Sequence, residues 1–246
     1  MLAIIGGSGL TQLSSLEAQR REVVRTPYGE PSGALTFGRL SGREVIFLAR
    51  HGYGHTIPPH RVNYRANLWA LKQAGAQAIV SVSSVGGIRP DCVPGALVVP
   101  DQILDYTWGR ACTFFDGVEA PVRHIDFTHP YDETIRRHIL DAAREAGEAM
   151  IDGAVYATTQ GPRLESAAEI DRFERDGADV IGMTGMPEAA LVRELELPFA
   201  AISAVSNHAA GRGASAENVH FERVENVLQD AMARVRKVLV RLCAQS

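Results

Sequence analysis

The chain has 246 residues, 46% of them hydrophobic and 22% charged, which suits one compact α/β domain with a substantial buried core. The formal net charge is −4 and the basic residues are scattered, so a nucleic-acid partner is not expected. The three cysteines, Cys92, Cys112 and Cys243, are widely spaced and odd in number, which favours reduced thiols in a cytoplasm. There is no signal-peptide pattern and no run of 18 apolar residues, so no membrane span is expected.

Short apolar runs alternate with segments of helical period along the chain. The runs that we expect to form strands are Leu2–Ile5, Val45–Ala49, Ala78–Val82, Leu97–Val99, Ala154–Thr158, Asp179–Ile181 and Phe199–Val205. The expected helices are Asn63–Gln73, Glu133–Ala146, Ser166–Glu174 and Glu188–Glu194. A last helix carries one apolar stripe made of Val224, Val227, Leu228, Val235, Val238, Leu239 and Leu242.

This alternation predicts a twisted, mostly parallel (mixed) sheet flanked by helices. No Pro/Ser-rich linker divides the sequence, so we predict a single domain over residues 1–246. The segment from Tyr106 to His129 is aromatic, polar and irregular. We expect it to be an insertion that runs over the surface or toward another subunit.

A glycine-rich turn, Gly6–Leu10, follows the first predicted strand. Glycines let backbone N–H groups converge on an anion, and Ser8 adds a hydroxyl donor. A dinucleotide-binding loop would need a third glycine where this chain has Gln12, and a following helix, which Leu10–Leu16 indicates only weakly. The turn is therefore compatible with an anion site or with an ordinary strand end.

The second candidate segment, Ala49–His55, ends a strand on Arg50 and His51. Ligands of α/β sheets collect at the carboxyl ends of strands. Arg50 can bind a phosphate through two parallel hydrogen bonds, and His51 can add one, although a solvated strand end fits the local pattern equally well. The nearby histidines do not indicate a metal site, because glycines and prolines prevent a helix that would align them.

Two further junctions combine glycine with hydroxyl groups. Ser83 and Ser84 follow the strand Ala78–Val82, and Thr184 lies where a strand ends and a helix with Pro187 near its first position begins. A helix N-terminus is a natural anion site. Four strand ends that offer Gly, Ser or Thr, and Arg or His together predict one shared phosphate pocket.

These segments together resemble the trimeric purine nucleoside phosphorylase and methylthioadenosine phosphorylase family over nearly the whole chain. The most specific matches are Arg50–Asn67, Gly161–Glu165 and Gly182–Glu188. The methylthio branch is the closer one, particularly its bacterial S-methyl-5′-thioinosine phosphorylases. Leu164 replaces a phenylalanine of the family, and Ser8 replaces a threonine common in the methylthio branch.

The resemblance implies a nucleoside phosphorylase fold and phosphorolysis of a purine nucleoside, with inorganic phosphate as co-substrate and neither cofactor nor metal. It implies that phosphate is surrounded by Ser8, Arg50, His51, Ser83, Ser84 and Thr184. It also implies that Met183 lies against the ribose and that the base is contacted by Leu164, Glu165 and Asn207, the last two being catalytic. His124 matches the residue that a neighbouring subunit lends to the 5′ end, so a homotrimer is expected.

Donor and acceptor matching then indicates the base. A 6-oxopurine presents an acceptor at O6 and a donor at N1, which suit the amide of Asn207 and an ionised Glu165. Members of the family that prefer adenine carry aspartates at the positions of Asn207 and Ala209, and tend to carry serine at that of Glu165. The sequence therefore predicts a hypoxanthine-type base, as in S-methyl-5′-thioinosine. Without the resemblance, Glu165 would be interpreted as a carboxylate at a helix start and Asn207 as a turn residue at a strand end.

The 5′ subsite stays open between two alternatives. His220 falls near the 5′ group of the sugar, where a histidine suits a hydroxyl and hence inosine or guanosine. The match is loose there, so a shift of one or two residues would bring Val219 or Phe221 to this place and favour a methylthio group. A methylthioadenosine phosphorylase, a non-catalytic nucleoside binder on the same fold and, least favoured, a nicotinamide-dependent oxidoreductase complete the alternatives.

Overall fold

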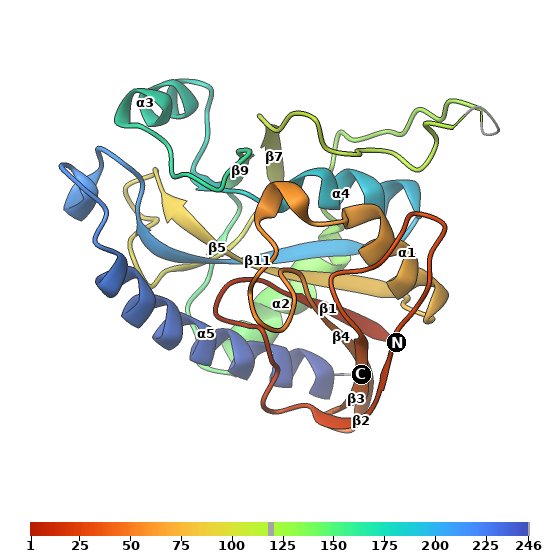
Figure 1. Cartoon of the computed structure of the whole chain (residues 1–246). Helices are drawn as coiled ribbons and strands as arrows, with labels where there is room; N and C mark the ends of the chain where they lie inside the picture. The colour runs from red at the N-terminus through yellow and green to blue at the C-terminus, as the bar shows by residue number, and fades with distance from the viewer. Residues whose placement is uncertain (118–120, 246) are drawn as a thin grey trace.

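The computed structural model describes residues 1–117 and 121–245, and these residues form a mixed sheet covered by helices on both faces (Figure 1). The strands are β1 (Leu2–Gly6), β2 (Glu17–Glu22), β3 (Leu35–Leu40), β4 (Arg43–Ala49), β5 (Ala78–Gly87), β6 (Leu97–Val99), β7 (Gln102–Asp105), β8 (Ile151–Asp152), β9 (Val155–Thr158), β10 (Val180–Gly182) and β11 (Phe199–His208). The helices are α1 (Tyr64–Gln73), α2 (Glu133–Glu145), α3 (Ala167–Arg175), α4 (Gly185–Glu194) and α5 (Phe221–Ala244), with short 3₁₀ turns at Pro59–Arg61 and Gly213–Ser215.

The strands follow the order β2-β3-β4-β1-β5-β10-β9-β7, while β11 pairs with both β5 and β6, and β8 extends from β6. β5 is central, because it lies parallel to β1 and β11 and antiparallel to β10. Each predicted strand and each predicted helix is found, within a few residues of its expected ends. The predicted mixed α/β fold is thus confirmed.

Side-chain alternation along β1 explains the layers. Leu2 and Ile4 pack with residues of α2 and α5, whereas Ala3 and Ile5 pack with residues of α1 and α4. Figure 1 shows α2 and α5 below the sheet and α1 and α4 above it. The strand is buried on both faces, which is why it reads as a continuous apolar run.

Strands β2, β3, β7 and β8 were missed by the sequence analysis. β2 is polar and exposed at every position, so it has no hydrophobic pattern to detect. The helix weakly indicated at Leu10–Leu16 does not form; this segment is turn and irregular backbone. Within the described part of the chain, no helix is long and apolar enough to cross a membrane.

The segment that follows β7 leaves the body of the molecule as an extended arm (Figure 1). The root of the arm, residues 110–114, is held by the buried carboxylate of Glu194. This carboxylate accepts hydrogen bonds from Thr113 Oγ1 at 2.6 Å and from the backbone N–H of Phe114 at 2.7 Å. Beyond residue 120 the arm carries exposed side chains, including Val122. The prediction of an irregular surface insertion is confirmed for the described residues.

Candidate active site

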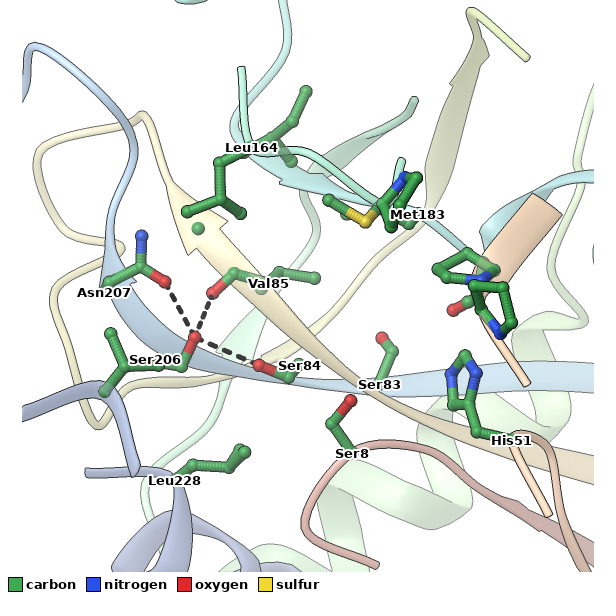
Figure 2. Close-up of a pocket in the computed structure, with 18 of the residues that line it drawn as sticks. Ser8, His51, Ser83, Ser84, Val85, Leu164, Met183, Ser206, Asn207 and Leu228 are labelled. Carbon is green, nitrogen blue, oxygen red and sulfur yellow. Dashed lines mark hydrogen bonds between the residues drawn. The ribbon is translucent and has the colours of Figure 1, made fainter. Parts of the chain in front are cut away.

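A cavity of about 720 Å³ opens at the carboxyl ends of β1, β4 and β10 and beside β5 and β11 (Figure 2). Ten of the predicted site residues line it: Ser8, Arg50, His51, Ser83, Ser84, Leu164, Glu165, Met183, Thr184 and Asn207. They come from segments far apart in the sequence. The predicted convergence of these loops on one pocket is therefore found.

The polar side chains divide the pocket into two ends. Ser8, Ser83 and His51 lie toward one end, and Asn207 and Leu164 lie toward the other (Figure 2). Thr184 directly precedes α4, and its hydroxyl makes no capping bond with the helix. The backbone of α4 is non-helical at Met186, so the regular helix begins after that residue and the expected helix N-terminus does not lie at Thr184. The first end thus offers hydroxyl groups that can donate to an anion.

Ser83 and Ser84 do not follow a strand, as the sequence had suggested, but lie within β5. The strand continues to Gly87 because it pairs with β11 and then with β10. Ser83 Oγ lies 3.2 Å from Ser203 Oγ on β11, and Ser84 Oγ donates to Ser206 Oγ at 3.0 Å. The central strand itself thus supplies hydroxyl groups to the pocket.

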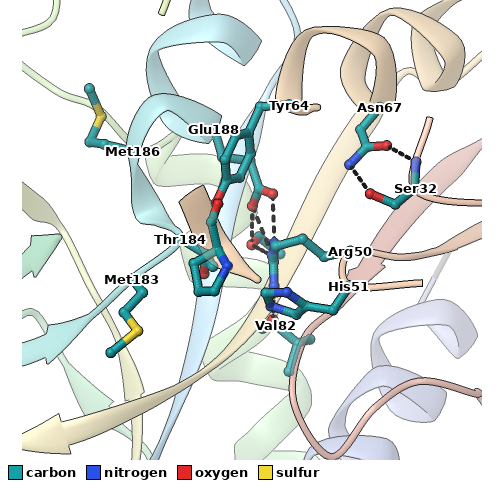
Figure 3. Close-up of polar contacts among 12 residues, drawn as sticks. Ser32, Arg50, His51, Tyr64, Asn67, Val82, Met183, Thr184, Met186 and Glu188 are labelled. Carbon is teal, nitrogen blue, oxygen red and sulfur yellow. Dashed lines mark hydrogen bonds and ion pairs between the residues drawn. The ribbon is translucent and has the colours of Figure 1, made fainter. Parts of the chain in front are cut away.

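Arg50 is fully buried, and its guanidinium is already occupied on the side that could have bound a phosphate in bidentate fashion (Figure 3). Its Nε donates to Glu188 Oε1 at 2.8 Å, and its Nη2 donates to Glu188 Oε2 at 2.9 Å. Nη2 also donates to Ser81 Oγ, and Nη1 donates to the carbonyl oxygen of Val82. Four of the five N–H groups of the guanidinium are used, and one N–H of Nη1 remains. The prediction that Arg50 binds phosphate through two parallel hydrogen bonds is therefore wrong.

Glu188 is the residue that sequence reasoning missed. Burial alone would lower the pKa of the Arg50 guanidinium, but the charge of Glu188 and its hydrogen bonds raise that pKa overall. Gly7 leaves room for this arrangement, because a Cβ there would lie 2.7 Å from Nη1 of Arg50. A glutamate in the first turn of a mostly apolar helix, four residues after Thr184, was the available signal.

His51 is buried and hydrogen-bonded through Nδ1 to the carbonyl oxygen of Ile57 at 2.8 Å. Since a carbonyl oxygen only accepts, Nδ1 carries the proton and Nε2 of the neutral ring is an acceptor. Burial, and next the positive charge of Arg50, lower the pKa of His51 to about 4. At neutral pH, Nε2 of His51 can therefore accept a hydrogen bond but cannot donate one.

The amide of Asn207 is fixed in one orientation. Its Nδ2 donates to the carbonyl oxygen of His208 at 2.7 Å, and its Oδ1 accepts from Ser206 Oγ at 2.8 Å. Because the carbonyl can only accept, the nitrogen is assigned by chemistry, and its second N–H remains for a ligand. Ser206 also accepts from Ser84, so hydroxyl groups link the two ends of the pocket (Figure 2).

Glu165 lies near the same end of the pocket. Thr159 Oγ1 donates to Glu165 Oε1 at 2.5 Å. Burial raises the pKa of the Glu165 carboxyl, although the bond from Thr159 opposes the shift. The ionised form is an acceptor only, whereas the protonated form can donate, so the protonation state of Glu165 decides which base edge it accommodates.

His124 and His220 are not brought into the cavity of their own chain. His124 is exposed on the arm, and His220 is the exposed N-cap residue of α5. Val219 and Phe221, on either side of His220, do line the cavity, together with Val224 and Leu228 of α5. The start of α5 thus forms an apolar wall, and the second alternative for the 5′ subsite matches the geometry.

The residues that the structure describes contain no cluster of three or more His, Cys, Asp or Glu side chains that could hold a metal ion. The His51 and His55 rings lie 4.7 Å apart, but Nδ1 of His51 is committed to Ile57. The chemistry available to the cavity is that of hydroxyl groups, one amide, one carboxylate, the remaining N–H of Arg50 and the imidazoles of His51 and His55.

The family model described as "Phosphorylase superfamily" matches residues 1–244. The chain belongs to the phosphorylase superfamily. It is 52% identical, over 99% of its length and 98% of the relative's, to a probable S-methyl-5′-thioinosine phosphorylase of Pseudomonas syringae pv. tomato. It is 44% identical to the 6-oxopurine nucleoside phosphorylase of Pyrococcus furiosus, covering 98% of this chain and 91% of that protein.

Among solved structures of the superfamily, methylthioadenosine phosphorylase from Schistosoma mansoni in complex with adenine is similar, with a TM-score of 0.94 and 32% identity. This similarity covers 99% of this chain and 90% of that one. The nucleoside phosphorylase fold and the enzyme class expected from the sequence are both confirmed. The protein is a phosphorylase of purine nucleosides, and thus a pentosyltransferase.

The buried ion pair generates the first prediction. Glu188→Gln keeps the shape of the side chain but leaves the Arg50 charge buried without a counter-charge, so the free energy of unfolding should fall by about 3–5 kcal/mol. Chemical denaturation measures it. Glu174→Gln is the control, because Glu174 pairs with Arg212 at the surface, and it should cost less than about 1 kcal/mol. Equal losses in the two variants would contradict the assigned importance of the buried pair.

His51 generates the second prediction. Because the pKa of His51 is about 4 in the folded protein, against 6.5 for an unperturbed histidine, the unfolded chain binds a proton that the folded chain does not. This contribution makes stability fall as pH falls from 6.5 toward 4. Urea unfolding at pH 7 and pH 4.5 should show His51→Asn losing about 2 kcal/mol less than wild type on acidification. The exposed His138→Asn variant should behave like wild type, and a His51→Asn loss as large as that of wild type would refute the assignment.

Proposed function

We propose that the protein splits S-methyl-5′-thioinosine with inorganic phosphate into hypoxanthine and 5-methylthioribose 1-phosphate. The observation that carries the proposal is the single cavity that joins a hydroxyl-lined anion end, a fixed amide beside a carboxylate, and an apolar wall. Phosphate acts as co-substrate, and no cofactor or metal takes part. The three cysteines form no disulfide bond in the described part of the chain, which accords with the cytoplasmic location that we propose.

Phosphate occupies the end formed by Ser8, His51, Ser83, Ser84 and Thr184. The hydroxyl groups donate to its oxygens, and Nε2 of His51 accepts from its O–H group. Arg50 contributes its remaining N–H and holds the wall in place through Glu188. With phosphate under C1′, the bond from C1′ to N9 breaks as the bond from C1′ to a phosphate oxygen forms, and the electron pair leaves with the purine.

The protein promotes this exchange by positioning and electrostatics. The phosphate dianion stabilises positive charge that develops on the sugar, and Met183 packs against the ribose. The free N–H of Asn207 donates to O6 or N7 of the departing purine, where negative charge develops. Ionised Glu165 accepts from N1–H, and Leu164 packs on the base. Asn207 and Glu165 are therefore the catalytic pair of the proposal.

The apolar wall favours a methylthio substituent over a hydroxyl group. Within one chain, Val219, Phe221, Val224 and Leu228 offer the 5′ end an apolar surface, on which a methylthio group packs better than a hydroxyl group. His220, which would have suited a hydroxyl, lies outside this lining. The relative from Pyrococcus furiosus keeps inosine and guanosine as the second candidate substrates, and the Schistosoma mansoni enzyme keeps methylthioadenosine as the third.

The experiment follows free base released from methylthioinosine, methylthioadenosine and inosine, with and without phosphate. Methylthioinosine should be cleaved best, and only with phosphate. A buried group that faces the wrong base edge costs about 1–3 kcal/mol, so two mismatches should reduce kcat/KM for methylthioadenosine by about a hundredfold. Equal kcat/KM values for methylthioinosine and methylthioadenosine would refute the base assignment, and binding without turnover would indicate a nucleoside-binding protein.

A paired variant sharpens this prediction. Ala209 is buried and lines the cavity two residues after Asn207. Replacing both residues by Asp supplies acceptors for the amino group of adenine, so the preference should move toward methylthioadenosine, even at reduced total activity. The matched control is Ala209→Ser, which adds a polar group without a charge and should leave the preference for methylthioinosine in place.

We further propose that the active unit is a homotrimer, in which the arm brings His124 to the 5′ end of a neighbour's pocket. This rests on the exposure of His124 on the arm and on the family resemblance. Light scattering should give three times the 26.6 kDa chain mass. His124→Ala should raise the nucleoside KM while the trimer persists, and a fully active monomer would contradict the proposal.

A further inference from the structure

Arg110, at the root of the arm, makes a set of hydrogen bonds that have no direct part in the proposed reaction. Its Nη2 donates to the carbonyl oxygens of Thr159 at 3.1 Å and Gln160 at 2.8 Å. Its Nη1 donates to the carbonyl oxygens of Met183 at 2.9 Å and Met186 at 2.6 Å. One guanidinium thus joins four backbone carbonyl groups from two segments that are distant in the sequence.

Both segments carry pocket residues. The first runs from β9 toward α3 and ends in Leu164 and Glu165; the second is the turn between β10 and α4 and contains Met183 and Thr184. They touch closely, because a Cβ on Gly161 would lie 2.5 Å from the sulfur of Met183. The distance between the base-contacting and ribose-contacting residues therefore depends on how these two backbones are held together.

The bond to Thr159 has a direct consequence for Glu165. The residue whose carbonyl accepts from Arg110 also donates its hydroxyl to Glu165 Oε1. A chain of two hydrogen bonds thus leads from the guanidinium to the carboxylate that faces the base. Displacement of the Thr159 backbone would move the donor that orients Glu165.

The guanidinium is suited to this task by geometry and not by charge pairing. Among the described residues, its hydrogen-bond partners are carbonyl oxygens, the side-chain oxygen of Gln160 at 3.1 Å and the hydroxyl of Tyr64 at 3.3 Å, and none is a carboxylate. A planar fork with five donors can reach acceptors on two sides at once. A lysine ammonium is a point charge with three donors and cannot span both segments.

We propose that Arg110 is a positioning residue that sets the separation of the 159–165 and 183–186 segments, and thereby the affinity of the pocket for the nucleoside. The inference rests on the proposed function, since it concerns the nucleoside end of the same cavity. Phosphate binding depends on it much less, because most residues at the phosphate end come from β1, β4 and β5, which Arg110 does not touch.

The test compares steady-state constants of wild type, Arg110→Ala and Arg110→Lys with methylthioinosine and phosphate as varied substrates. Both variants should raise the nucleoside KM by about tenfold or more and change the phosphate KM by less than about threefold. Ethylguanidinium added to Arg110→Ala should lower the nucleoside KM again, because it can occupy the vacated position. A merely structural defect would lower the active fraction, and hence kcat, without raising the nucleoside KM relative to the phosphate KM.

Arg65→Ala is the matched control. Arg65 holds the same part of the arm, through the carbonyl oxygen of Thr113 and the carboxylate of Asp116, but does not bind the four carbonyls. It should keep the wild-type nucleoside KM. Equal KM increases in the Arg65 and Arg110 variants, or a wild-type KM in Arg110→Lys, would overturn the inference. If Arg110→Ala does not fold, Arg110→Lys decides the outcome.

The proposed function and this inference fail in different ways. A wild-type protein that releases no hypoxanthine in the presence of phosphate would contradict the proposed function. Calorimetric binding of methylthioinosine without phosphate then gives the same comparison of variants without relying on turnover. Unchanged binding in both Arg110 variants would contradict the role of Arg110, whatever reaction the cavity performs.

Discussion

The buried ion pair between Arg50 and Glu188 organises the end of the cavity at which we propose that phosphate binds. It joins the end of β4 to the first turn of α4, and hydrogen bonds to Ser81 and Val82 extend it to β5. Removing one partner would leave a charge in an interior with no water, which makes such a pair a strong constraint on geometry even where its net contribution to stability is small. The elements that carry His51 and Thr184 are thereby held against the central strand.

This arrangement changes how the anion end works. The guanidinium is largely neutralised by Glu188, and the neighbouring imidazole is uncharged at neutral pH because burial and the guanidinium lower its pKa. In the proposed reaction, hydroxyl groups therefore carry more of the interaction with phosphate than fixed positive charge does. Under that proposal, the site would select anions that offer an O–H group to His51.

The other end of the cavity is set by hydrogen bonds that orient polar groups before any ligand arrives. Ser206 and the carbonyl of His208 fix the amide of Asn207, and Thr159 fixes the carboxylate of Glu165. Preorganised donors and acceptors cost no reordering when charge develops in the transition state. Under the proposed function, the same rigidity would make the choice of base selective, since an adenine would face a donor and an acceptor in the reversed order.

The sequence by itself determined the layered fold and ten of the residues that line the cavity. Buried strands such as β1 are apolar at every position, and the loops that follow them carry glycine, hydroxyl groups, Arg50 and His51. It could not reveal that Arg50 is paired with Glu188, because 138 residues separate them and only packing brings them together. The sequence also could not show whether His220 or its apolar neighbours line the cavity. A shift of one residue at the start of a helix turns a different side chain toward the cavity, and only the tertiary structure fixes that register.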